Sequence, residues 1–210
     1  MDASRWTLSR AVARLAAVTV TVTVAVAVVA LALPPAFAQS AAAEPEWVAA
    51  SRQLAQGLGG QLRSRLALAV GNGPVQAIAV CRVEAPAIAA RLSAESGADV
   101  GRVALRVRNR SNVARGWSRE ALLGFERSIA AGASAATLET YAESGGVRRY
   151  ARAIGTEPMC TLCHGDQIAP EIAATIRRSY PADRAVGFKP GDLRGAIVVT
   201  WKAPRRASSP

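Results

Sequence analysis

The stretch Arg102–Arg108 has the sequence RVALRVR, in which an apolar residue occupies every second position. Successive side chains of a β-strand point to opposite faces of its sheet, so this alternation predicts a strand with one buried face and one face in water. The apolar positions are Val103, Leu105 and Val107, and the other face carries Arg102, Ala104, Arg106 and Arg108. A β-sheet is therefore expected to begin here.

Two helices are predicted before this strand. Residues 47–70 carry leucine at every fourth position, which predicts one apolar stripe along a helix that Gly59-Gly60 weakens. Residues 75–96 place apolar side chains at steps of three and four, hence on one helical face, with Pro86 marking a kink or a restart. The first stripe consists of Leu54, Leu58, Leu62 and Leu66, and the second of Ile78, Cys81, Ala85, Ile88 and Leu92.

The elements after the strand complete the expected fold. Residues 119–131 are predicted to form a helix, and residues 147–154 and 196–201 two further strands. This order predicts an α+β fold with helices beside a small antiparallel sheet. Because 210 residues suffice for one apolar core and are too few for two full-sized domains, a single domain over residues 47–201 is expected.

Residues 1–38 have the features of an export signal. Three arginines precede an apolar run over residues 15–33, and Ala36-Phe37-Ala38 follows it. Cleavage after Ala38 is expected, which places the domain in the periplasm or otherwise outside the cytoplasm. The run is also long enough to span a bilayer, so an uncleaved membrane anchor is the alternative. A short tether over residues 39–46 and a flexible C-terminal tail over residues 202–210 are expected to flank the domain.

The composition is that of a globular protein with a strongly basic balance. Half of the residues are apolar, one fifth are charged, and the formal net charge is +11, almost wholly from arginine. Such a charge can attract nucleic acid or an anionic membrane. The arginines are scattered, however, without a polybasic run or an aromatic stacking series. We therefore expect no nucleic-acid partner, and a membrane contact only if the export signal is retained.

Residues 157–166, EPMCTLCHGD, hold two of the three cysteines and the only histidine. Cys160, Cys163 and His164 form the sequence C-x-x-C-H, which attaches haem in c-type haem proteins. Two thiols one helical turn apart can each add to a vinyl group on one porphyrin edge, and the neighbouring imidazole then ligates the iron. Attachment of this kind takes place outside the cytoplasmic membrane, in agreement with the export signal. The sequence therefore predicts one covalent haem c, with His164 as the proximal ligand.

Two other interpretations of these residues compete with haem. A C-x-x-C pair also serves thiol–disulfide exchange, but there it begins a helix after a strand of a βαβ unit, and no such pattern surrounds Cys160. Three cysteines and one histidine are also the ligand set of a structural Cys₃His zinc site. Against zinc, Cys163 and His164 are sequence neighbours, and adjacent side chains seldom converge on one tetrahedral ion. Both remain alternatives without haem.

The motif does not fix the sixth ligand of the iron. The usual partner is a second histidine or a methionine, but the chain has no second histidine, Met1 lies in the export signal and Met159 adjoins Cys160. Cys81 also fits a simpler role as a small buried residue on the apolar face of its helix. The remaining candidates are Cys81, Lys189, Lys202, water or an open position.

Four stretches bear on this choice: AIAVCRVEAPAIAARLS at 77–93, RVALRVRNRSNVARGW at 102–117, CTLCHG at 160–165 and YPADRAVGFKPGDLRGAIVV at 180–199. In them the chain resembles a family of single-haem c-type proteins with a PAS-like fold, found alone and as sensory input domains. The resemblance implies a PAS-like haem domain with haem on Cys160 and Cys163, His164 on the iron and Cys81 as the sixth ligand. The sequence departs from the family at Arg110, where proline is common.

These features suggest a redox-active haem protein that senses redox state or a gas, or carries electrons. A redox partner protein or a small gas ligand is the expected partner, and the sequence leaves the oligomeric state open. We do not expect an enzyme, because neither a second histidine nor paired carboxylates stand near the motif. Haem propionates need cationic partners. The candidates are Arg106 and Arg108 on the first strand and Arg148 and Arg149 before the motif.

Overall fold

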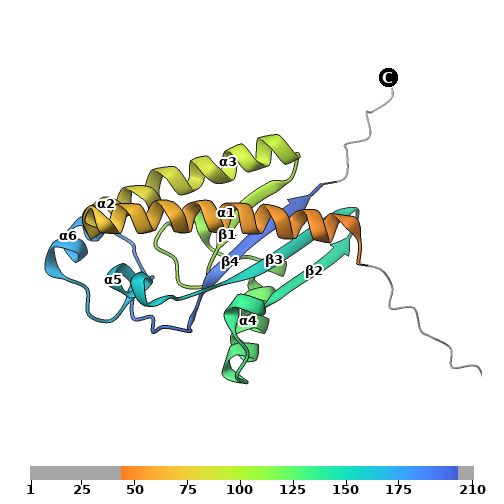
Figure 1. Cartoon of the computed structure of the whole chain (residues 1–210). Helices are drawn as coiled ribbons and strands as arrows, with labels where there is room; N and C mark the ends of the chain where they lie inside the picture. The colour runs from red at the N-terminus through yellow and green to blue at the C-terminus, as the bar shows by residue number, and fades with distance from the viewer. Residues whose placement is uncertain (1–43, 203–210) are drawn as a thin grey trace, which may run out of the picture. The chain divides into compact units, whose positions relative to one another are not determined.

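The computed structural model describes residues 44–202, which form helices around one four-stranded antiparallel sheet (Figure 1). The strand order is β1-β4-β3-β2, so the last strand lies between the first and the third. The predicted α+β fold and small antiparallel sheet are confirmed. The strands are β1 (Asp99–Val103), β2 (Glu139–Ser144), β3 (Val147–Gly155) and β4 (Leu193–Trp201).

Helices cover both faces of the sheet. Figure 1 shows α1 and α3 along one face and α4 on the other. The first three helical segments follow one another closely, because α2 continues through a π-helical turn, Val80–Glu84, directly into α3. The helices are α1 (Glu46–Gly71), α2 (Pro74–Ala79), α3 (Ala85–Ser96), α4 (Trp117–Ala130), α5 (Thr161–His164) and α6 (Pro170–Ser179).

The larger core lies between α1, α3 and the sheet. Leu58 of α1 and Tyr150 of β3 are fully buried in it. The predicted leucine stripe of α1 is confirmed, since its four members are buried or pack against the buried clusters. Gly59, which was expected to weaken this helix, has a role in packing. A Cβ at this position would lie 3.3 Å from Cδ1 of Ile197 on β4. The glycine lets the helix approach the sheet closely.

The second core lies on the opposite face, under α4. Leu122 and Phe125 of this helix are buried against strand residues that are mostly alanine. Small side chains on the sheet leave room for the large ones of the helix. The buried strand alanines of this layer are Ala151, Ala153 and Ala196.

The prediction of a strand over residues 102–108 is wrong in its bounds and in expecting one solvent-exposed face. β1 covers Asp99–Val103, and the chain then leaves the sheet. Ala104 makes an isolated parallel bridge to Val113 instead of continuing the ladder. Neither face of the sheet is left to solvent as expected, because α1 and α3 cover one face and α4 covers the other.

Sequence reasoning missed one strand and one helix. β2 pairs with β3 in a hairpin whose two turn residues, Gly145 and Gly146, both have positive φ (59° and 73°). This is the turn geometry that glycine favours in two-residue hairpins, so the Gly-Gly pair was a usable signal. α6 is a short amphipathic helix whose Ile172 and Ile176 pack against Ile78 of α2. The other predicted helices and strands lie within a few residues of the observed ones.

Several expectations about the ends of the chain fall outside the described residues. The export signal over 1–38, most of the tether over 39–46 and nearly all of the tail over 202–210 belong to this group. The tether prediction extends slightly too far, since Glu46 is the first residue of α1. Within residues 44–202, no helix combines the length and the apolar character that a membrane span requires.

A network of charged side chains fastens the start of α1 to the hairpin. Glu139 of β2 accepts hydrogen bonds from Arg52 of α1 (3.0 Å from Nε), from the hydroxyl of Tyr150 (2.6 Å) and from Arg152 (3.2 Å). Arg52 also pairs with Glu44 at 2.6 Å. The hydrogen bonds from Arg52 lower the pKa of Glu139 below its ordinary value. The ionised carboxylate thus stabilises the folded chain.

We expect Glu139→Gln to lower the free energy of unfolding by about 1–2 kcal/mol, because the Tyr150 hydroxyl and two guanidinium groups lose their anionic acceptor. A carboxylate whose folded pKa is lowered contributes stability above its unfolded pKa, and that contribution disappears as the pH falls through the folded value. The parent should therefore lose more stability below about pH 4.5 than the variant does. Urea unfolding at pH 7 and pH 4 measures both effects.

Glu143→Gln is the matched control for this network. Glu143 lies on the same strand but is half exposed and pairs only with Arg148. Its replacement should change stability by less than about 0.5 kcal/mol. Equal effects of the two variants would contradict the role assigned to Glu139.

Candidate functional site

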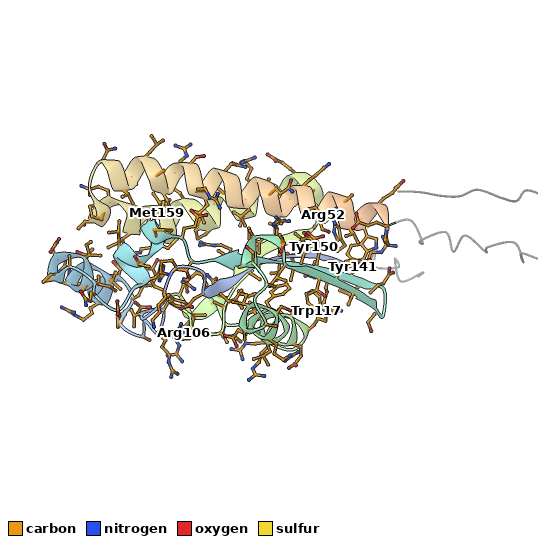
Figure 2. The ribbon with its side chains drawn as sticks, turned by 60° about the horizontal axis from the view of Figure 1, so that its bottom comes forward. Arg52, Arg106, Trp117, Tyr141, Tyr150 and Met159 are labelled. Atoms are coloured by element: carbon orange, nitrogen blue, oxygen red, sulfur yellow. The ribbon has the colours of Figure 1, made fainter. Side chains whose placement is uncertain are left out.

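A cavity opens between the C-terminal half of α1, the α2 segment and the ends of strands β1, β3 and β4. Its walls are mostly apolar, and they also carry all three cysteines and the histidine. Figure 2 shows Met159, one of the lining residues, beneath the C-terminal half of α1. The apolar lining consists of Leu62, Leu66, Val70, Ala77, Ile78, Val103, Ala104, Val107, Ile154 and Met159.

The C-x-x-C-H residues form one wall of this cavity. A 3₁₀ turn, Pro158–Cys160, leads into the single turn α5, which ends at His164. Cys160 and Cys163 are half-buried free thiols that face the same space. Gly165 closes the turn tightly: a Cβ at this position would lie 2.7 Å from the carbonyl oxygen of Thr161. The glycine after the histidine is therefore required by the local backbone.

The imidazole of His164 is held in one orientation. Its Nδ1 lies 2.7 Å from the carbonyl oxygen of Ala185, which can only accept, so Nδ1 carries the proton and Nε2 keeps a free lone pair. Phe188 packs edge-on against the ring. Burial lowers the pKa of His164 well below its ordinary value, and the nearby guanidinium groups of Arg194 and Arg108 lower it further. His164 is thus a neutral imidazole with an available Nε2.

A buried ion pair, Arg108–Asp183, holds the backbone around His164 in place. Arg108 donates to Asp183 (3.1 Å), to the carbonyl of Cys163 (2.5 Å) and to the carbonyl of Ala185 (3.4 Å). Asp183 in turn accepts a 2.8 Å hydrogen bond from the backbone N–H of Ala185. The side chains of both ionic partners are about nine-tenths buried. Arg108 therefore fixes the carbonyl that orients His164 and the backbone of the second thiol.

Cys81 lines the same cavity from the α2 side, about eighty residues before the motif. It lies in the π-helical turn, in which the N–H of Ala85 reaches the carbonyl of Val80, five residues back. Pro86, which follows, has no N–H to continue a regular ladder, and the π turn passes into α3 here, where the sequence predicts a kink or a restart. Single π turns inside helices are frequent at functional sites. The fold thus brings Cys81 and the C-x-x-C-H residues to one space.

The four arginines predicted to meet propionates have different positions. Only Arg108 lines the cavity. Arg106 stacks over Phe188 at 3.8 Å and, in Figure 2, lies on the side away from Met159, because the chain bends out of the sheet after Val103. Arg148 and Arg149 lie on β3 opposite Trp201 and Thr200, outside the cavity lining. The structure does not bring these last three to the cavity.

The alternative sixth ligands also lie elsewhere. Lys202 is exposed and pairs with Asp99 at 2.7 Å. Lys189 is exposed, and neither lysine lines the cavity. Within residues 44–202, no group of three histidine, cysteine or acidic side chains is arranged to hold a metal ion by itself, so the Cys₃His zinc interpretation gains no support.

The pKa values of the Cys160 and Cys163 thiols argue against a role in thiol–disulfide exchange. Burial raises the pKa of both Cys160 and Cys163 above the ordinary value. A C-x-x-C pair that exchanges disulfides needs a lowered thiol pKa, since the thiolate is the nucleophile. The pair in this cavity is thus kept protonated at neutral pH.

Several residues of the site were not assigned a role from the sequence. Arg102 and Arg194 line the cavity, and Asp183, Ala185 and Phe188 support the histidine. The last four lie in the stretch 180–199, one of the four that carried the resemblance. That stretch was a usable signal, because the loop before β4 folds back on the motif: Phe188 N–H donates to the His164 carbonyl at 2.9 Å.

These features place the chain among α+β domains with an apolar cavity that presents sulfur and imidazole donors. The sequence model of the Tll0287-like family matches residues 9–201, so the chain belongs to the Tll0287-like family. Among solved structures it is similar to the cyanobacterial haem protein Tll0287, with 31% sequence identity and a TM-score of 0.58 over 79% of this chain and 100% of that one. A comparison with curated proteins gives no match.

Proposed function

We propose that this chain is an exported c-type haem protein with a PAS-like fold, holding one haem covalently on Cys160 and Cys163. The proposal rests on one observation: four side chains line the same apolar cavity. They are the two thiols of the C-x-x-C pair, the neutral imidazole of His164 and the separate thiol of Cys81. Family membership and the similarity to a cyanobacterial haem protein support it. The antiparallel sheet with a cavity beneath its covering helix supports the PAS-like assignment.

The residues present fit a haem in three respects. The walls from α1, α2 and the sheet are apolar, as a porphyrin face requires. The two thiols of the C-x-x-C pair stand one turn apart on one wall, so each sulfur could add across one vinyl double bond, with its hydrogen passing to the other vinyl carbon. Cationic side chains at the cavity edge suit the two propionates.

His164 and Cys81 would be the axial ligands. A haem bound here would supply reversible one-electron chemistry and the capacity to bind small gases. His164 is oriented for this role by the Ala185 carbonyl, and the hydrogen bond at Nδ1 raises the basicity of Nε2. Cys81 would contribute a sulfur ligand, and a thiolate favours ferric over ferrous iron. Neither lysine lines the cavity, and Met159, which does, adjoins Cys160 on the wall that carries the C-x-x-C-H residues.

The ligand pair favours a sensing role over simple electron carriage. An electron carrier needs axial ligands that stay in place in both redox states. A thiolate binds ferrous iron less well than ferric iron, so the Cys81 side chain would be released more readily on reduction and open the distal side to a gas. A redox partner protein or a small gas is thus the proposed partner, in the periplasm, and the role is binding and signalling rather than catalysis.

Haem content tests the proposal directly. The exported protein should be red and keep its colour through acid–acetone extraction, because thioether bonds survive denaturation. The Cys160→Ala/Cys163→Ala variant should lose all covalently bound haem, as measured by the absorbance of the denatured chain. Cys81→Ala, the matched control from the same cavity, should retain it. A colourless parent carrying one zinc ion per chain would refute the haem assignment.

A further inference from the structure

Two arginines line the cavity without an acidic partner. Arg102 comes from β1 and Arg194 from the start of the neighbouring strand β4, and both are largely removed from solvent. Among residues 44–202, neither arginine forms an ion pair, whereas Arg108, which also lines the cavity, pairs with Asp183. The cavity wall thus carries two cations whose charge the described chain does not balance.

The hydrogen bonding of these two side chains is equally incomplete. Arg194 donates one long bond, 3.4 Å, to the carbonyl of Arg106 and stacks 5.3 Å from the Phe188 ring centre. Arg102 donates no side-chain hydrogen bond to any described residue. A guanidinium has five N–H donors, and burying it without partners is costly. Burial, together with repulsion from Arg108 and Arg102, lowers the pKa of Arg194 to about 10.

Both arginines line the same cavity from neighbouring strands of the sheet. β1 and β4 are paired antiparallel, with Arg102 opposite Ile197, and β4 shifts register against β3 between Gly195 and Leu193, so Arg194 is the extra residue of a bulge. Gly195, next to Arg194, has no room for a side chain, since a Cβ would lie 2.4 Å from the Val103 carbonyl. The strands are therefore closely apposed where the arginines flank the cavity.

We propose that Arg102 and Arg194 bind the two carboxylates of the cofactor, the haem propionates. This assignment rests on the proposed function. Planar guanidinium groups pair with carboxylates in a bidentate manner, and such charge-assisted bonds remove the cost of burying both charges. Arg102 and Arg194 replace Arg106, Arg148 and Arg149 as the propionate partners, while Arg108 acts on the protein backbone.

The same cations influence the iron. Positive charge near the metal disfavours the more positive ferric state, so each arginine raises the midpoint potential. Removal of one arginine leaves a carboxylate unpaired in a partly buried site, which raises the carboxylate pKa toward neutral pH. The potential should then fall overall and should also vary with pH, because protonation of that carboxylate returns part of the lost positive charge.

The experiment compares the covalently loaded Arg102→Gln and Arg194→Gln variants with the parent and with Arg148→Gln. Arg148 is a suitable control because it is half exposed, paired with Glu143 and outside the cavity. Redox titrations followed by visible absorption are run at pH 5–8. We expect each cavity variant to lower the midpoint at pH 8 by about 59 mV, a tenfold change in the one-electron equilibrium constant. A pH dependence absent from the parent and the control should accompany this shift.

The remaining outcomes separate this assignment from the proposed function. Loaded variants that match Arg148→Gln at every pH would overturn the role of the two arginines and leave the haem assignment intact. A parent without covalent haem would instead refute the proposed function. A midpoint of the parent that moves when phosphate or acetate is added would show that the arginines bind free anions rather than the propionates, which also overturns the assignment.

Discussion

Replacement of Arg108 by leucine is expected to lower the free energy of unfolding by about 3–5 kcal/mol, the usual cost of breaking a buried ion pair from one side. The side chains of Arg108 and Asp183 are only 8% and 10% exposed, so solvent does not replace the lost partner. The substitution leaves Asp183 as an unpaired buried charge and removes the donor to the Cys163 carbonyl. Urea or thermal unfolding of the purified variant measures the loss.

Two further variants test the cause of this loss. The double variant Arg108→Leu/Asp183→Leu removes both charges together, so its loss should be clearly smaller than the sum of the two single losses. Arg108→Lys keeps a positive charge but cannot reach three acceptors at once, and it should fold with an intermediate loss. A loss of less than about 1 kcal/mol for Arg108→Leu would show that Arg108 does not support the site.

Arg108 also shows what the sequence could and could not predict. Its alternation with Val103 and Val107 indicated a strand with arginines in water, whereas β1 ends at Val103 and Arg108 is buried. A pattern of period two reports only on neighbours along the chain. The partner that makes burial possible, Asp183, is seventy-five residues away, and no local signal connects the two.

The elements with strong local signals were predicted well. The leucine stripe of α1 arises from contacts along one helix, and the structure confirms it. Beside Pro86, where a kink or a restart is predicted, the π-helical turn passes directly into α3. The helix over 119–131 and the strand over 147–154 are close to α4 and β3. β2 was missed because Glu139–Ser144 alternates only weakly, and its place depends on pairing with β3.

The residues of the candidate site also differ in how well the sequence could predict them. The C-x-x-C-H residues are contiguous and were recognisable from their spacing alone. Cys81 required the resemblance to a known family, because its π-helical turn faces the motif only in the folded chain. Arg102 and Arg194 lie in stretches that carried the resemblance but were not singled out among the many arginines, since only the three-dimensional arrangement shows that they have no acidic partner among residues 44–202.

Cys81→Ser is expected to keep the covalent haem and to change the distal side of the iron. A serine hydroxyl is a far weaker iron ligand than a thiolate, so the ferric spectrum should change from low-spin to high-spin or water-ligated. The loss of a negative ligand should raise the midpoint potential by at least about 59 mV, a tenfold change for a one-electron couple. Absorption spectra and a redox titration of the variant measure both effects.

The direction of this shift separates the role of Cys81 from that of the arginines. We expect loss of a Cys81 thiolate ligand to raise the potential and loss of a cavity cation to lower it, so the two kinds of variant should act in opposite directions on one observable. CO should also bind faster to the reduced variant, since no sulfur competes for the sixth position. Lys189→Ala is the control, because Lys189 is exposed and outside the cavity, and it should match the parent. If Cys81→Ser also matches the parent in spectrum and potential, Cys81 only packs in the cavity wall, and the proposed release of a ligand on reduction is wrong.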